Sequence, residues 1–290
     1  MKILVLGASG MIGLAVYNHL VKNKNFKVIG TTTKSNAKKI IENQNKLNSL
    51  VLFDFLKDKN IENLIRSINP NIIINCIGII KQSSLMTNKI NTIFLNSILP
   101  NKLSILAFKH GIKLIQISTD CVFSGKVGSY VESDNPDPID TYGRTKLIGE
   151  IVNDNSLTLR TSLVGHELFT KNGLLEWFLS QKNECIGFKN AFFSGFTTNA
   201  FAKILETILL NKNELKGLYH ISSNIISKYD FLEKINKEYK KNIKINPDHS
   251  FNINRSLNSS ALQKKIGYNI ESWDIMIREM FSERFLYVQK

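Results

Sequence analysis

The first residues of the chain constrain its fold most strongly, because a short apolar run leads directly into three glycines separated by two residues each. Residues 2–6 predict a buried strand, and the apolar periodicity that follows residues 7–13 predicts a helix. At such a junction Gly7 permits a tight turn, Gly10 lets the backbone approach a pyrophosphate, and Gly13 lets the helix pack closely on the strand. The helix N-terminus then faces the anion. We therefore expect a Rossmann-like α/β domain that cradles a dinucleotide.

The second informative stretch follows an apolar run at residues 112–117, which predicts a strand buried in the sheet. Thr119 stands at its carboxyl end, where parallel α/β sheets hold their ligands. Tyr142 and Lys146 follow a polar loop, and their four-residue spacing puts both on one face of a helix that the preceding Asp or Thr would cap. A nearby cation is expected to lower the pKa of Tyr142. The stretch predicts a proton-transfer site, with Thr119 bonded to the same substrate oxygen.

The second strand, predicted at residues 26–31, indicates which cofactor is preferred. An acidic residue about 20 positions after the glycines would hold the ribose 2′-hydroxyl of NAD, and none is present. Residues 31–35 are instead Thr-Thr-Thr-Lys-Ser, whose hydroxyls and cation suit a 2′-phosphate. We therefore expect NADP(H), with Thr32 and Lys34 among its contacts.

The glycine spacing, Ser118-Thr119-Asp120 and Tyr142-Gly143-Arg144-Thr145-Lys146 together resemble the extended short-chain dehydrogenase/reductases. Residues 118–125 are similar to the dTDP-4-dehydrorhamnose reductase branch, which usually has an aromatic residue where Cys121 stands. The resemblance implies an α/β fold: a Rossmann-like doubly wound parallel sheet with a small C-terminal substrate-binding lobe. It assigns residues 1–164 and about 196–224 to the NADP-binding domain, and about 165–195 and 225–290 to the lobe.

Further cofactor contacts are expected at the ends of the third and fourth strands. Residues 50–53 predict the third strand, and Asp54 at its end is where relatives contact the adenine, although an Asp here is also an ordinary turn residue. Residues 72–78 predict the fourth, whose small-residue turn lets the backbone pass close to the ribose and nicotinamide. With the glycine turn, the expected contacts also include Ser9, Met11, Ile12, Phe55, Asn75, Cys76 and Gly78.

On the substrate side, the resemblance puts Gly195 and Thr197 where the family lines its nucleotide-sugar site. Arg255 lies in a segment similar to the family's C-terminal one, so its planar fork is expected to pair with a sugar diphosphate. A Ser-rich capping turn is the alternative for Arg255, and a structural role is the alternative for His166. The full set of expected substrate-binding residues is Asp120, Val122, His166, Gly195, Thr197 and Arg255.

Length and composition exclude several other classes of protein. A chain of 290 residues that is 43% apolar can bury an α/β core and a smaller lobe, and it has no tract long enough to cross a membrane. It opens on a strand without a charged and apolar leader, so no signal peptide is expected. Cys76, Cys121 and Cys185 show neither metal-ligand spacing nor a disulfide framework. We expect a cytoplasmic protein without a metal site.

The net charge of +14 raises nucleic acid as a partner. The basic residues are dispersed and are not interleaved with aromatic residues, so nucleic acid is not expected. A basic surface would still attract a doubly anionic nucleotide sugar. The sequence leaves a homodimer open.

These features predict NADPH-dependent reduction of a keto group on a nucleotide-linked deoxysugar, in the synthesis of surface polysaccharide sugars. Tyr142 would supply the proton to the developing alkoxide and Thr119 would polarise the carbonyl. The resemblance implies that Lys146 tunes the phenol and holds the nicotinamide ribose.

Three other interpretations were weighed against this one. A 4,6-dehydratase would carry a second carboxylate after Asp120, where Cys121 stands. A nucleotide-sugar epimerase would keep NAD tightly bound, and the missing acid after the second strand argues against it. A non-catalytic NADP-binding regulatory subunit is the alternative of a different class, and the intact Thr119, Tyr142 and Lys146 count against it.

Overall fold

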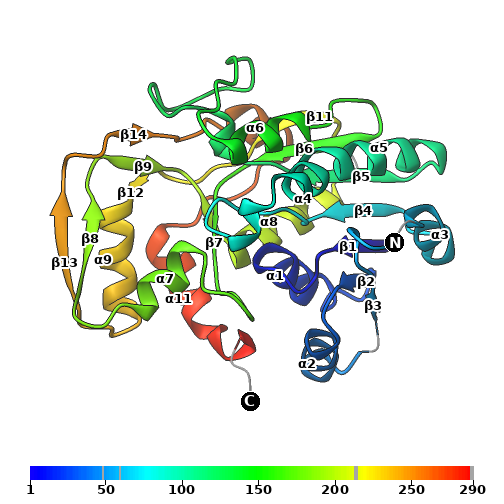
Figure 1. The fold of residues 1–290 in the computed structure, drawn as a ribbon, viewed down its shortest axis with the longest axis horizontal. Helices are drawn as coiled ribbons and strands as arrows, with labels where there is room; N and C mark the ends of the chain where they lie inside the picture. The colour runs from blue at the N-terminus through cyan, green and yellow to red at the C-terminus, as the bar shows by residue number, and fades with distance from the viewer. Residues whose placement is uncertain (48, 59, 212–214, 288–290) are drawn as a thin grey trace.

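The apolar runs of the chain form a seven-stranded sheet in the order β11-β6-β5-β4-β1-β2-β3, in which all neighbouring strands are parallel (Figure 1). We describe it from a computed structural model that covers residues 1–47, 49–58, 60–211 and 215–287. The strands are β1 (Lys2–Leu6), β2 (Lys27–Thr32), β3 (Leu50–Leu52), β4 (Ile72–Asn75), β5 (Lys113–Ile117), β6 (Ser156–Arg160) and β11 (Gly217–His220). The predicted fourth strand is shorter than expected, since it ends at Asn75.

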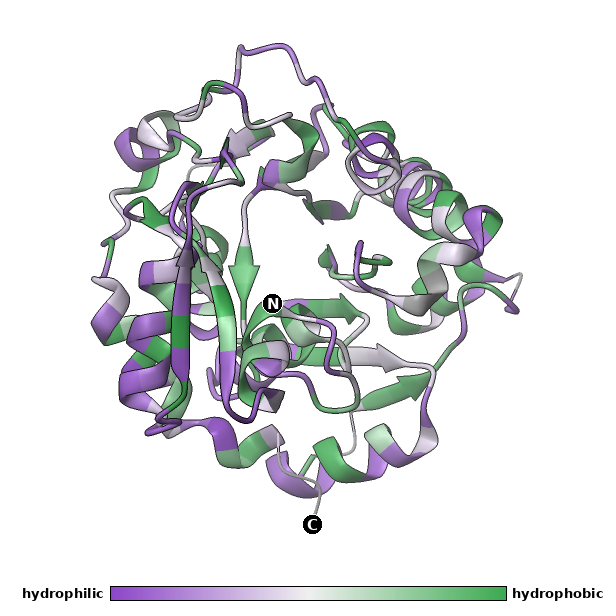
Figure 2. Ribbon diagram, turned by 60° about the vertical axis from the view of Figure 1, so that its left-hand side comes forward, coloured by the Kyte–Doolittle hydropathy of each residue, from purple (hydrophilic) through white to green (hydrophobic). Residues whose placement is uncertain are grey.

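The central strands of this sheet are buried on both faces, which explains why β1, β4 and β5 are almost continuously apolar. Side chains alternate along a strand, so Ile3 and Val5 enter one hydrophobic cluster while Leu4 and Leu6 enter a second. The first cluster is covered by α1 (Met11–Leu20), α2 (Ser35–Asn45) and α8 (Thr198–Leu210), and the second by α3 (Ile61–Ile68) and α5 (Leu99–Lys109). The central strands are predominantly hydrophobic in Figure 2, whereas the helices carry both kinds of residue. The predicted doubly wound α/β fold is confirmed.

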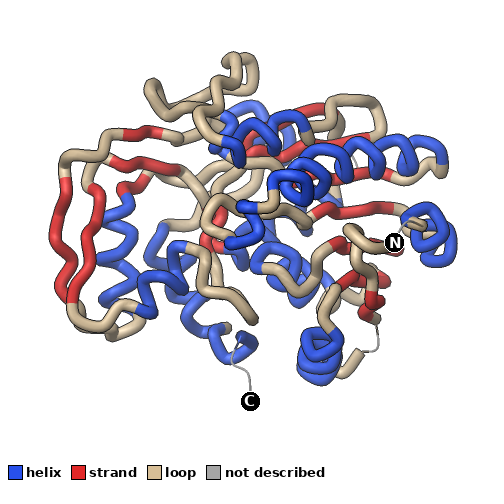
Figure 3. The backbone as a smooth tube through the Cα atoms, viewed as in Figure 1, coloured by secondary structure: helices blue, strands red, loops and turns tan. Residues whose placement is uncertain are grey.

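Residues after β6 also build three small sheets beside the carboxyl edge of the large one (Figure 3). They pair β10 with β7, β12 and β14 with β9, and β13 with β8. The strands are β7 (Leu163–Val164), β8 (Glu184–Phe188), β9 (Ala191–Phe193), β10 (Phe196–Thr197), β12 (Ile226–Ser227), β13 (Lys244–Asp248) and β14 (Ile253–Asn254). The helical elements among them are α7 (Leu174–Ser180), α9 (Lys228–Glu238), α10 (Ser260–Ile266), α11 (Trp273–Ser282) and η4 (Arg284–Tyr287). The division into two domains stays a prediction.

The helical stretch from Ser84 to Lys109 is irregular before Pro100. It consists of η1 (Ser84–Thr87), α4 (Lys89–Ile93), the π-helical segment η2 (Phe94–Ile98) and α5. Pro100 occupies the first turn of α5, where its ring fits the helix. The π-helical segment buries Asn96 completely, and the Asn96 side chain bonds to the Thr145 hydroxyl.

Among the described residues, no helix combines the length and apolar character that a membrane span requires. Over the same residues, no group of three or more His, Cys, Asp or Glu side chains is arranged to hold a metal ion.

Candidate active site

The glycine turn between β1 and α1 is as tight as the spacing predicts. Gly7 has a φ of +77°, and a Cβ at Gly13 would lie 2.1 Å from the carbonyl oxygen of Gly7. Gly10 stands at the N-cap of α1 without a side-chain cap, so first-turn amides are left for a ligand. The junction fits the pyrophosphate of a dinucleotide, since added side chains would fill the space that backbone approach requires. Met11 and Ile12, both partly exposed, begin the helix at this point.

The end of β2 is bonded to the glycine turn. The backbone amide of Gly7 donates to the Thr31 hydroxyl at 3.1 Å, and the Thr32 hydroxyl donates to that of Ser9 at 2.8 Å. The exposed ammonium of Lys34 lies 4.6 Å from the ring centroid of Phe169. These contacts place the hydroxyls and the cation expected for a 2′-phosphate beside the turn, with no acidic side chain among residues 31–35.

Lys34 is the residue through which the cofactor preference is tested. We expect NADPH to be preferred over NADH, and Lys34→Ala to narrow the gap in catalytic efficiency by about tenfold, because one charge-assisted contact with the 2′-phosphate is lost. Steady-state kinetics with both cofactors measures this. Lys39→Ala, at another exposed lysine of α2, is the matched control. Equal efficiency with NADPH and NADH in the unmutated protein would contradict the prediction.

Three expected cofactor contacts have side chains that the fold itself uses. Asp54 is a turn residue, whose carboxylate accepts from the backbone amide of Leu56 at 3.0 Å. The side chain of Phe55 is buried in the second hydrophobic cluster. Asn75 is fully buried and donates to the Gln116 side chain at 2.8 Å. Contact of these three residues with the cofactor stays a prediction, and for Phe55 and Asn75 it would run through the backbone, since both side chains are buried.

The turn after β4 instead brings Cys76 and Gly78 to Lys146. A Cβ at the exposed Gly78 would lie 3.9 Å from the Lys146 ammonium. Burial raises the pKa of Cys76 to about 12, and the charge of Lys146 opposes that rise. The Asn96 amide holds this turn, since its oxygen accepts from the backbone amide of Ile79 at 2.8 Å and its nitrogen donates to the Thr145 hydroxyl at 3.1 Å.

Helix α6 (Thr141–Ile148) carries Tyr142 and Lys146, and Asp140 is its cap, with a carboxylate that accepts from the Gly143 amide at 2.8 Å. The Lys146 ammonium donates to the carbonyl of Ile117, the last residue of β5, at 2.6 Å. Burial lowers the pKa of Lys146 to about 8, although Glu150 and Cys76 oppose the change. The helix thus anchors its ammonium at the carboxyl end of the sheet.

Tyr142 and Thr119 form the second half of the site. Burial raises the pKa of Tyr142, Cys121 raises it further, and a side-chain hydrogen bond with Thr119 lowers it. The expected lowering of this pKa by a nearby cation is therefore wrong for this structure, because burial dominates and the Lys146 ammonium bonds to Ile117. The phenol consequently holds its proton at neutral pH, as a general acid must.

A buried ion pair stabilises the segment that carries Ser118 and Thr119. Arg160 and Glu150 form two hydrogen bonds of 2.8 Å, and Glu150 also accepts from the Ser118 hydroxyl at 2.6 Å. Ser118 is thereby committed to the scaffold. The Thr119 hydroxyl donates to the Asp120 carboxylate at 3.2 Å and accepts from the Cys121 amide at 3.1 Å, so it must turn away from Asp120 to donate to a substrate. Sequence reasoning missed Glu150, although an arginine within a buried strand signals the need for an acidic partner.

The guanidinium of Arg255 lies against η3 (Asp120–Val122), close enough to Asp120 for its charge to act on that carboxyl group. Arg255 donates from Nε to the Phe123 carbonyl at 3.0 Å and from Nη1 to the Cys121 thiol at 3.4 Å, which leaves buried Nη2 without a partner. Burial raises the pKa of Asp120, and the charge of Arg255 opposes the rise. An unpartnered buried guanidinium nitrogen beside the reaction site fits an anionic ligand.

Three other expected substrate contacts are corrected. Val122 is fully buried in a small cluster with Phe123, so no ligand reaches its side chain. Thr197 is fully buried and caps α8 by accepting from the Ala200 amide. A Cβ at Gly195 would lie 2.2 Å from the Ser162 carbonyl oxygen, so this glycine permits close backbone packing. Gly195 and Thr197 therefore shape the segment rather than offer side chains to a substrate.

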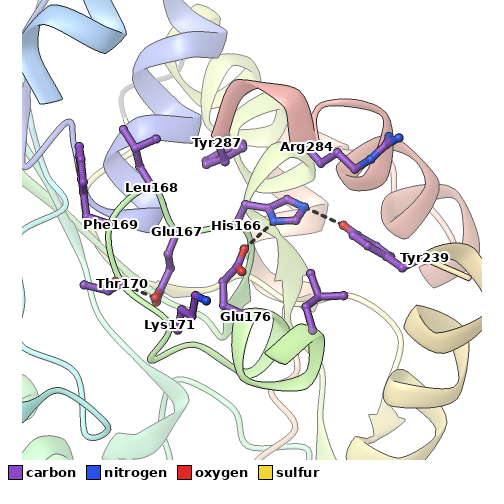
Figure 4. Close-up of a pocket in the computed structure, with 11 residues that line it drawn as sticks. His166, Glu167, Leu168, Phe169, Thr170, Lys171, Glu176, Tyr239, Arg284 and Tyr287 are labelled. Carbon is purple, nitrogen blue, oxygen red and sulfur yellow. Dashed lines mark hydrogen bonds and ion pairs between the residues drawn. The ribbon is translucent and has the colours of Figure 1, made fainter. Parts of the chain in front are cut away.

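His166 lies in a cavity of about 420 Å³ between α7, Tyr239 and the C-terminal η4, which is also lined by Phe169 (Figure 4). Its Nδ1 is 2.6 Å from the Glu176 carboxylate and its Nε2 is 2.8 Å from the Tyr239 hydroxyl. Both ring nitrogens are thus occupied by side chains of the protein. The assignment of His166 to the substrate is corrected in favour of the structural alternative.

The sequence matches, over residues 1–284, the family described as the RmlD substrate binding domain. The chain belongs to this family. The RmlD family consists of extended short-chain dehydrogenase/reductases, which confirms the resemblance seen at the glycine turn and at Tyr142. The family match agrees with the expected class of NAD(P)-dependent oxidoreductase, and one relative of known structure is in complex with NADP, as the expected cofactor requires.

Individual relatives of the RmlD family differ in what their names describe. The chain is 25% identical over 246 residues to dTDP-4-dehydrorhamnose reductase of Aggregatibacter actinomycetemcomitans, covering 79% of this chain and 76% of the relative. It is 27% identical over 243 residues to methionine adenosyltransferase 2 subunit beta of Xenopus laevis, covering 77% and 67%. The structure of Bacillus anthracis dTDP-4-dehydrorhamnose reductase in complex with NADP aligns with a TM-score of 0.79 at 21% identity, over 97% of this chain and 99% of that one.

Proposed function

We propose that the protein uses NADPH to reduce a keto group on a nucleotide-linked 6-deoxysugar destined for a surface polysaccharide. The observation that carries the proposal is the convergence of Thr119, Tyr142 and Lys146 at the carboxyl end of β5, beside a glycine turn that fits a dinucleotide. A cytoplasmic location and the absence of nucleic acid as a partner belong to the same proposal.

When bound, NADPH supplies the hydride for the carbonyl carbon. The phenol of Tyr142 gives its proton to the carbonyl oxygen as that oxygen gains negative charge, and the phenolate left behind recovers a proton from solvent. Thr119 donates a hydrogen bond to the same oxygen and so stabilises the developing alkoxide. Lys146, anchored by Ile117 next to Gly78, holds the nicotinamide ribose and favours the phenolate after proton transfer.

The proposal is tested by following NADPH oxidation with a panel of dTDP- and UDP-linked 4-keto sugars, with the corresponding free keto sugars alongside. Binding energy from the remote diphosphate holds the sugar carbonyl against Thr119 and Tyr142, so free sugars are expected to react far more slowly. Equal reaction of the free sugars would overturn the nucleotide-sugar proposal.

Arg255 is expected to act on the nucleotide-linked substrate alone. Arg255→Ala should reduce catalytic efficiency with the nucleotide sugar by about tenfold or more, because a guanidinium contact with the diphosphate is lost. Any activity on a free sugar should be unchanged. Arg278→Ala, at an exposed arginine of α11, is the matched control. Normal turnover of the nucleotide sugar by the Arg255 variant would return this residue to a structural role.

A second candidate is a non-catalytic NADP-binding regulatory subunit, favoured by the similarity to methionine adenosyltransferase 2 subunit beta. The same panel separates the two candidates. A regulatory subunit would bind NADPH without oxidising it on any of the keto sugars, whereas a reductase would turn over at least one of them.

A further inference from the structure

The pairing of three short strands brings a second cation, Lys228, near Arg255. In this sheet β12 and β14 flank β9, and Ser227 of β12 and Asn254 of β14 both lie opposite Phe192 of β9. Residues opposite one another share a face of a sheet, and successive residues alternate between the faces. Arg255 directly follows Asn254 and its backbone amide donates to the Phe192 carbonyl, so its side chain belongs to the face opposite the Phe192 side chain. Lys228 follows Ser227 as the first residue of α9, close enough to Arg255 for the two charges to act on each other.

The contacts of Arg255 show which part of the protein this face borders. Its guanidinium reaches the Phe123 carbonyl and the Cys121 thiol, the residues that follow Thr119 at the end of β5. Gly125 makes this approach possible, since a Cβ there would lie 3.0 Å from Cγ of Arg255. This face of the β12-β9-β14 sheet therefore borders the proton-transfer site.

Lys228 has no partner of its own at this position. Its side chain is half-buried, and within the described part of the chain its ammonium makes neither a hydrogen bond nor an ion pair. The charged groups that act on it are Asp120, Cys121, Arg255 and Lys81. Burial lowers the pKa of Lys228, while Asp120 raises it.

The charges around Lys228 do not balance. Lys81 is paired with Asp140 at 3.0 Å, so these two charges offset each other. Lys228 and Arg255 then share the single carboxylate of Asp120, which leaves one positive charge in excess. Leaving a partly buried cation and a buried guanidinium nitrogen unpaired costs free energy, and an anion that meets both donors would recover it.

We propose that Lys228 and Nη2 of Arg255 together bind the diphosphate of the substrate, one from each side of β9. The identity of the ligand rests on the proposed function, whereas the need for a multiply charged anion follows from the two unpartnered donors. Two cations from separate strands would hold a diphosphate at two points and so fix the sugar relative to Tyr142. Sequence reasoning missed Lys228, since a lysine after a serine in a lysine-rich chain looks like an ordinary helix start.

The test is isothermal titration of the full-length protein with dTDP, UDP and inorganic pyrophosphate, each in the presence of NADPH. Lys228→Met keeps the length of the side chain and removes its charge, and it is expected to weaken binding of all three probes by about tenfold or more. Lys228→Arg should retain most of the affinity. Lys237→Met changes an exposed lysine of the same helix and should bind as the unmutated protein does.

Several outcomes decide the question. Unchanged probe affinity in Lys228→Met would overturn the proposal, and so would a fall in turnover with unchanged affinity, because Lys228 would then act on Asp120 instead. Thermal unfolding of each variant shows whether it folds, and Lys228→Gln replaces Lys228→Met if the latter does not. Probe binding that depends on Lys228 without turnover of any keto sugar would leave the anion site standing while the reductase proposal fails. Turnover of a keto sugar that does not depend on Lys228 would leave the reductase proposal standing while the anion site at Lys228 fails.

Discussion

Replacing Tyr142 with Phe is expected to lower turnover by about 10² or more, because the general acid is removed while the ring that fills the site stays. The phenol holds its proton at neutral pH, since burial raises its pKa, and its hydrogen bond with Thr119 directs it to the substrate oxygen. NADPH affinity should be nearly unchanged. Steady-state NADPH oxidation measures the turnover, and fluorescence titration with NADPH measures the affinity for NADPH.

Tyr219→Phe is the matched control for this variant. It makes the same chemical change on the edge strand β11, where Tyr219 packs against the ammonium of Lys265, and it should retain normal turnover. A Tyr142→Phe protein with near-normal turnover would falsify the assignment of the general acid. A large loss of NADPH affinity in that protein would instead give Tyr142 a role in binding.

Gly13→Val is expected to abolish measurable NADPH binding. The added Cβ would lie 2.1 Å from the carbonyl oxygen and 2.7 Å from the carbonyl carbon of Gly7, so β1 and α1 must move apart. Overpacking of this kind typically costs about 1–3 kcal/mol in the free energy of unfolding, and here it also displaces the amides that face the pyrophosphate.

Gly10→Ala separates damage to the fold from damage to the cofactor site. The nearest atom to a Cβ at Gly10 is the Gly7 carbonyl oxygen at 3.4 Å, so the fold should tolerate the methyl group. We expect nearly unchanged thermal unfolding together with weaker NADPH binding, because the methyl group stands where the backbone approaches the pyrophosphate. Wild-type NADPH affinity in Gly13→Val would show that this junction does not bind the cofactor.

The sheet was predictable because each of its strands carries a local signal. An apolar run that ends in a small or polar turn indicates a buried parallel strand, and such runs lie at β1, β3, β4 and β5, whereas β6 alternates between apolar and polar residues. The cap of α6 was predictable for the same reason. Asp140 lies three residues before Gly143, whose backbone amide donates to the Asp140 carboxylate. The π-helical segment before Pro100 had no such signal, because packing around Asn96 imposes it.

The candidate site was predictable only in part. Thr119, Tyr142 and Lys146 meet as their strand and helix predicted, but the direction of the Tyr142 pKa shift was wrong. A cation four residues away lowers that pKa only where its charge outweighs burial, and the amount of burial depends on segments distant in the sequence.

By itself the sequence determined the glycine turn, the order of strands and helices, and the proton-transfer residues, because each depends on residues close together along the chain. Only the tertiary structure decided which polar side chains remain free for ligands. Asn75, Thr197 and His166 are engaged in internal hydrogen bonds. Lys228 and Arg255 instead follow the two strands that flank β9, and each keeps a donor without a partner among the described residues. A buried polar group binds whichever partner the fold brings to it, and the spacing of residues along the chain does not contain that information.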